Sequence, residues 1–160
     1  MSFQIKALPA AAFNPLFKLS DSELADHAAM WVSADRNPGF PCRVSLRDAQ
    51  VGETLLLVNF EHHAVANPFR SRHAIFVRKN AGEAQLDVDE VPEMLLTRLL
   101  SLRAFDESGM MVNADVVKGT MLARAVNRMV RSERVHFLHA HNAKAGCFMA
   151  RIERACDRPV

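Results

Sequence analysis

The last third of the chain constrains the fold most, because it predicts two strands with a very short connection. The segments are "RVHFLHAH", which ends at His141, and "GCFMARIERA", which begins at Gly146; "NAKA" joins them. Apolar and polar side chains alternate along both segments, as they do on a strand. Antiparallel strands can be joined by a tight turn, whereas parallel strands need a crossover of a dozen or more residues. The pattern therefore predicts an antiparallel hairpin.

The same two-residue period recurs along the chain. Asp106 and Gly109 mark the turn of a second hairpin within "LRAFDESGMMVNADVV". The remaining predicted strands are residues 3–8, 29–34 and 53–62, and a segment from about Arg72. Between the second and third of these, residues 35–43 form a rigid loop, because two prolines and a glycine disfavour helix and central strand alike. The chain thus predicts about eight strands joined mainly as hairpins.

Three segments predict helices. "LSDSELADHA" begins with a capping box of Ser20 and Glu23, and "PEMLLTRLL" has Pro92 in its first turn. "GTMLARAVNRMVRS" places Leu122, Val126 and Met129 on one stripe and arginines on another. We therefore expect an α+β fold, in which about three helices pack against a mainly antiparallel sheet of about eight strands. A chain of 160 residues is expected to form one domain over residues 1–160.

The composition of the chain bears on which kinds of molecule it can bind. The chain has 20 basic and 18 acidic residues, a net charge of +2, so no strong field favours nucleic acid. We also expect no membrane partner, because no apolar run is long enough to span a bilayer. Three cysteines and no secretory leader predict free thiols and a cytoplasmic location. No glycine-rich phosphate loop is present, and the sequence indicates no cofactor.

The final hairpin also supplies the best candidate site. Alternation places His139 and His141 on the same face as Phe137. On the return strand, alternation places Cys147, Met149 and Arg151 on that same face, and a tight "NAKA" turn brings His141 opposite or diagonal to Cys147. An exposed sheet face more commonly carries Thr, Lys and Glu. The sequence therefore predicts a polar Cys/His face at this hairpin.

Two chemistries fit that face. Cys147 can act as a nucleophile with His141 as its base, while His139 or Asn142 orients the imidazole. Alternatively, His139, His141 and Cys147 can bind zinc with water or a fourth ligand from Cys42 or His73, although CxxC and HExxH motifs are absent. The structural alternative is that the histidines bond nearby carbonyls and the cysteine is a small buried side chain.

Several arginines near the predicted strands indicate that the chain binds a negatively charged ligand. The candidate ligand-binding residues are Arg72, His73, Arg103, Asn142, and the pair Cys42 and Arg43. Guanidinium groups bind carboxylate or phosphate through paired hydrogen bonds, so a small anionic ligand is the expected partner. The alternative is that these arginines form surface ion pairs with Asp35, Asp48, Glu61 or Asp106.

Four segments in order resemble a known family. "PGFPCRVSLRDAQVGE", "SRHAIFVR", "GMMVNADVV" and "HAHNAKAGCFMARI" are similar to the bacterial family described as domain of unknown function 1203, and the likeness runs from about Phe3 to Ala155. The resemblance implies a small single-domain protein. It implies no established activity, so it assigns no role to any residue.

The sequence leads to two functional hypotheses. In the first, the chain is a small-molecule enzyme or an anion-binding domain that uses the Cys/His face and the arginines. In the second, it is a noncatalytic structural or interaction module whose histidine cluster is incidental. Convergence of the histidines, Cys147 and the arginines at one place would favour the first hypothesis. Oligomeric state is not indicated.

Overall fold

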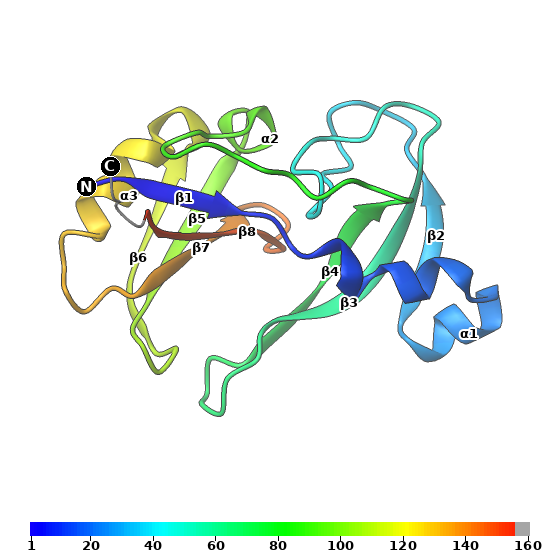
Figure 1. Ribbon diagram of the computed structural model, residues 1–160, viewed down its shortest axis with the longest axis horizontal. Coiled ribbons are helices and arrows are strands. Elements are labelled where there is room, and N and C mark those ends of the chain that lie inside the picture. The colour runs from blue at the N-terminus through cyan, green and yellow to red at the C-terminus, as the bar shows by residue number, and fades with distance from the viewer. Residues whose placement is uncertain (156–160) are drawn as a thin grey trace.

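The computed structural model describes residues 1–155, which form two antiparallel sheets (Figure 1). The larger sheet has the strand order β1 (Phe3–Lys6), β8 (Phe148–Arg154), β7 (Phe137–Asn142), β5 (Leu99–Phe105) and β6 (Met111–Lys118). The smaller sheet has the order β2 (Ala29–Ser33), β3 (Thr54–His63) and β4 (Ser71–Arg78). The eight strands and the α+β class are confirmed. The division into two sheets was not foreseen.

Three α-helices are present in the described residues: α1 (Asp21–Asp26), α2 (Glu93–Leu96) and α3 (Leu122–Met129). Short 3-10 turns occur at Ala10–Ala12, Asn14–Lys18 and Gly119–Met121. The predicted capping box is present, since the Ser20 hydroxyl accepts from the Glu23 amide and the Glu23 carboxylate accepts from the Ser20 amide at 2.7 Å. This satisfies two amides that the first helical turn leaves free.

The helix predicted from Pro92 is shorter than the sequence indicates. It ends at Leu96, and the chain enters strand β5 at Leu99. Leu100 and Leu102 are fully buried as alternate residues of that strand, so packing on the sheet overrides the helical propensity of the leucines.

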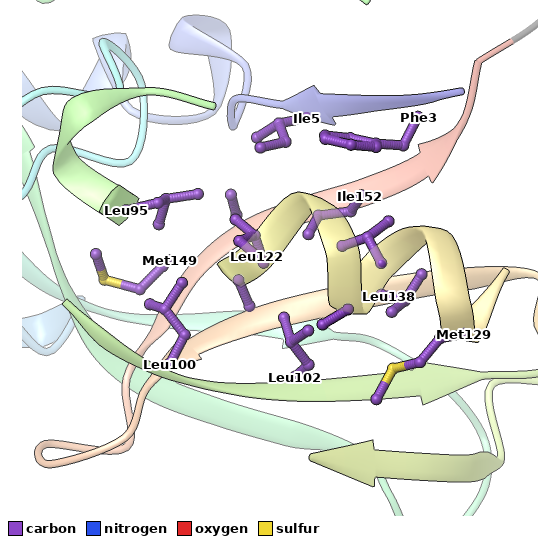
Figure 2. Packing of buried hydrophobic residues seen from close by; sticks show 14 of the residues in the cluster. Phe3, Ile5, Leu95, Leu100, Leu102, Leu122, Met129, Leu138, Met149 and Ile152 are labelled. Atoms are coloured by element: carbon purple, nitrogen blue, oxygen red, sulfur yellow. The ribbon is translucent and has the colours of Figure 1, made fainter. Parts of the chain in front are cut away.

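The main core lies between one face of the larger sheet and helices α2 and α3 (Figure 2). Leu122, Val126 and Met129 of α3 are buried against Leu138 and Ile152 of the sheet, as the predicted stripe requires. The helices therefore cover one face of β7. They leave its other face, which carries His139 and His141, to meet the smaller sheet.

The smaller sheet has its own apolar cluster, which includes Leu56, Val58, Ile75 and Val77. Arg43 connects the two sheets: its backbone amide donates to Phe76 O of β4, and its side-chain Nε donates to Phe148 O of β8. Within residues 1–155, no helix is long and apolar enough to cross a membrane.

Candidate functional site: a histidine cluster between the two sheets

An irregularity in β8 determines which side chains share a face with the histidines. His139 pairs with Arg151, whereas His141 pairs with Phe148, so the register shifts by one residue between these two pairs. Phe148 consequently lies on the histidine face, and Met149 is buried in the main core. The extra residue of a bulge interrupts strict alternation, which simple counting cannot anticipate.

The shift also changes the place of Cys147. Its side chain packs with the main apolar core and is 8% exposed. The prediction that Cys147 and Met149 lie on the face of His139 and His141 was therefore wrong. Arg151 does lie on that face, because it is the direct partner of His139.

Two further histidines join the cluster from the end of β3. The ring centroid of His62 is 5.0 Å from that of His141 and 6.0 Å from that of His139. The ring of His63 is 5.3 Å from that of His139, and His139 is 6.0 Å from His141. His62 and His63 were not among the site residues predicted from the sequence. Their adjacency in "EHH" was visible, but nothing local indicated that β3 ends against β7.

Aromatic rings fill the space around these histidines. Phe148 stacks on His62 at 5.2 Å and meets the edges of His139 and His141 at 5.0 and 5.8 Å. On the other side of His139, the rings of Phe105 and Phe137 lie 5.0 and 5.3 Å away. The imidazoles thus lie in a largely apolar environment.

Hydrogen bonds fix the proton on two of the rings. Nδ1 of His141 donates to Gly146 O at 3.0 Å, and Nε2 of His63 donates to Gly109 O at 2.9 Å. Carbonyl oxygens only accept, so the bonded nitrogens carry the hydrogens. In neutral His141, Nε2 is therefore an acceptor with a free lone pair.

Three buried ring nitrogens of this cluster have no hydrogen-bond partner among residues 1–155. They are Nε2 of His141, Nδ1 of His139 and Nδ1 of His62. A buried polar atom without a partner costs about 1–3 kcal/mol, so such atoms are infrequent in folded proteins. Three of them in neighbouring rings distinguish this cluster from an ordinary core.

Burial holds the same three histidines in the neutral form. It lowers the pKa of His139 to about 2 and that of His141 to about 3. The pKa of His62 falls to about 4, because of burial first and then the charges of His63 and Arg103. At pH 7 these three rings are therefore neutral donors and acceptors.

Arg103 of β5 is a cation beside this group. It pairs with His139 across the sheet and so lies on the same face, and it is partly buried. Burial lowers the pKa of its guanidinium. Within the described residues Arg103 makes no hydrogen bond and no ion pair, although its charge acts on both His62 and His141.

Of the other predicted ligand residues, His73 lies near the cluster and Arg72 does not contribute to it. Arg72 is exposed, donates to Asn59 Oδ1 at 2.7 Å and lies 4.0 Å from Glu61, as the ion-pair alternative expects. His73 contributes to the lowered pKa values of His62 and His141.

Asn142 shapes the turn that ends β7. Its side-chain oxygen accepts from the backbone amides of Lys144 and Ala145, at 3.0 and 3.2 Å. That oxygen is therefore already used within the "NAKA" connection.

Arg43 and Cys42 are interior residues. Arg43 is 1% exposed, and its Nε donates to Phe148 O at 2.7 Å while a second nitrogen donates to Pro41 O. Burial lowers the pKa of Arg43, an effect that the nearby thiols of Cys147 and Cys42 oppose. Cys42 is fully buried and its sulfur accepts from two backbone amides. Neither side chain reaches a surface where a ligand could contact it.

The zinc hypothesis finds no matching geometry in the described part of the chain. Among residues 1–155, no three His, Cys, Asp or Glu side chains are arranged so that they could hold a metal ion. His139 and His141 are neighbours, but Cys147 faces the core on the other side of the sheet.

Comparison with known proteins agrees with the resemblance noted from the sequence motifs. A search of curated proteins and a search of solved structures each found no match to this chain. A family model described as "Protein of unknown function (DUF1203)" matches residues 39–154, which is more than half of the chain and includes every residue of the histidine cluster. The chain therefore belongs to the DUF1203 family.

Proposed function

We propose that the histidine cluster and Arg103 bind a small anionic molecule. The observation that carries this proposal is the state of Arg103, which is partly buried and has no protein partner among residues 1–155. Removing a guanidinium from water is costly unless an anion compensates for it. A bound carboxylate or phosphate oxygen would supply that compensation through paired N–H donors.

The neighbouring imidazoles add polarity without adding charge. Nε2 of His141 offers a lone pair to a hydroxyl or a protonated group of the ligand. The unpartnered nitrogens of His62 and His139 gain partners if a ligand or ordered water lies between the rings. This arrangement supports ligand binding, with His141 Nε2 as a neutral hydrogen-bond acceptor.

Cys147 has no part in this proposal, because its side chain lies in the main core. The near balance of basic and acidic residues supports a small molecule rather than nucleic acid as the partner. Free Cys42 and Cys147 support a reducing compartment, and on that basis we propose a cytoplasmic location.

Thermal unfolding tests the proposal. Sodium acetate and inorganic phosphate are each added to the purified protein at constant ionic strength, and the Tm is measured. We expect at least one of the two anions to raise the Tm, because a ligand that binds only the folded state stabilises it. Arg103→Gln should abolish the rise. The control variant Arg124→Gln, which removes an exposed charge from α3, should keep it.

An incidental histidine cluster predicts a different result. In that case neither acetate nor phosphate changes the Tm of the wild-type protein beyond the change given by sodium chloride. A rise that persists in Arg103→Gln would also contradict the proposal, because it would place the anion elsewhere.

A further inference from the structure

We infer that the ligand of this site is a monocarboxylate with an apolar body, whose carboxylate binds Arg103 and whose body lies on an exposed strip of β5 and β6. The inference rests on the proposed anion site and specifies the class of ligand. The strip consists of Leu99, Ala114 and Val116, with Ser101 between them.

Strand register places the strip beside Arg103. Arg103 pairs with Ala114, Ser101 with Val116, and Leu99 with Lys118. Directly paired residues point to the same face, so these side chains continue the histidine face toward the sheet edge. The intervening residues Leu100 and Leu102 point to the core instead.

The strip is exposed although it is apolar. Val116 is 59% exposed and Leu99 is 43% exposed, while Ala114 belongs to the exposed class as well. Strand β6 is the edge strand of its sheet, where charged side chains would protect against unwanted association. A single exposed apolar residue is ordinary, but three on one face beside Arg103 fit an amphipathic ligand.

The charges on this face favour a single negative charge on the ligand. His62, His139 and His141 are neutral at pH 7 because burial lowers their pKa values. Arg151 is paired with Glu153 at 2.6 Å, and Lys118 lies at the far end of the strip. Among residues 1–155, Arg103 is an arginine on this face without an ion-pair partner, and it balances one carboxylate. A phosphate group, with up to two charges, would be left partly uncompensated.

The test compares four probes by titration monitored by NMR of the backbone amides. The probes are benzoate, hexanoate, acetate and inorganic phosphate, at constant ionic strength and pH 7. We expect benzoate and hexanoate to bind about tenfold more tightly than acetate or phosphate, because their bodies bury apolar surface on the strip. The largest shift changes should occur at the amides of Arg103, Ala114 and Val116.

Variants separate the strip from the anion site. Val116→Thr keeps the β-branched shape but removes an apolar methyl, so it should weaken benzoate binding about threefold and leave acetate binding unchanged. The matched control Val51→Thr replaces a valine that is 66% exposed on a distant turn and should change neither. Lys118→Gln should also leave benzoate binding unchanged.

The outcomes distinguish the two proposals. Equal affinity for acetate and benzoate, or tighter binding of phosphate, would overturn the apolar-body inference and still support an anion site at Arg103. Binding by none of the four probes would overturn both. Tight benzoate binding that survives Arg103→Gln would overturn both as well, because the carboxylate would then bind elsewhere.

Discussion

At the scale of single residues, the buried histidines link the candidate site to stability. His139 and His141 are each 1% exposed, and burial lowers their pKa values to about 2 and about 3. In the unfolded chain both titrate near pH 6.5. Below that pH the unfolded state binds protons that the folded state does not, so acid favours unfolding.

We therefore expect the free energy of unfolding to be highest above pH 6.5 and to fall as the pH decreases. For these two residues the slope should approach about 2.7 kcal/mol per pH unit below pH 5.5, since each bound proton contributes about 1.4 kcal/mol per unit. His62, with a pKa of about 4, acts in the same direction. Urea unfolding at pH 5.0 to 7.5 measures the slope. His139→Asn should reduce this slope by about 1.4 kcal/mol per pH unit, the contribution of one proton. An unchanged slope in this variant would contradict a buried, neutral His139.

Arg43 provides a second test at the residue scale. Its guanidinium donates to the carbonyls of Phe148 and Pro41 from a position that is 1% exposed. Arg43→Lys retains the charge but cannot reproduce the geometry of these donors. We expect a loss of about 2 kcal/mol in the free energy of unfolding, measured by chemical denaturation. The exposed control Arg124→Lys should change it by less than about 0.5 kcal/mol.

At the scale of secondary-structure elements, the passage from β6 into α3 depends on Gly119. A Cβ atom at this position would lie 1.8 Å from the carbonyl oxygen of Leu95, at the end of α2. The Gly119 amide also donates to Arg98 O at 2.8 Å, which fixes the close approach. We expect Gly119→Ala to cost about 3 kcal/mol or more, because backbone must move to admit the methyl group.

Gly82→Ala is the matched control, since nothing lies within 4 Å of the added Cβ atom. It should change the free energy of unfolding by less than about 0.5 kcal/mol. Equal effects of the two substitutions in thermal unfolding would show that the approach of Gly119 to α2 is not required.

Local sequence patterns predict the helices and strands well, but they predict poorly how these elements pack against one another. The capping box at Ser20 and the buried stripe of α3 follow from spacing within a few residues, and both are present. The place of Cys147 depends on a bulge in β8, and the end of α2 depends on the burial of Leu100 in a sheet. Those outcomes are decided by tertiary packing, which single-sequence periodicity does not contain.

The candidate site, too, depends on contacts between residues that lie far apart in the sequence. His139, His141 and Arg103 were expected to be site residues, and the structure places them on one face. His62 and His63 come from the other sheet, about 75 residues away in sequence, and only the docking of β3 against β7 brings them there. No spacing rule within the hairpin could have identified them.

For the whole molecule, the contacts between the two sheets determine whether they unfold as one unit. Contacts between them are buried and specific: Arg43 bonds to Phe76 of the smaller sheet and to Phe148 of the larger one, and His62 stacks on Phe148. The two hairpin ends also meet, since Asn67 Nδ2 donates to Ser108 O at 3.0 Å. Buried polar contacts of this kind are lost together when either sheet unfolds.

We therefore predict a single cooperative unfolding transition. Trp31, the one tryptophan of the chain, lies on β2 and stacks on Phe17, so its fluorescence reports the smaller sheet. Native-state hydrogen exchange of the amides of β5 and β7 reports the larger sheet. Both probes should give the same free energy of unfolding, because neither sheet keeps its buried partners alone. A free energy from Trp31 fluorescence clearly below that from the β7 amides would instead mean that the smaller sheet unfolds first and exposes the histidine cluster while the main core stays intact.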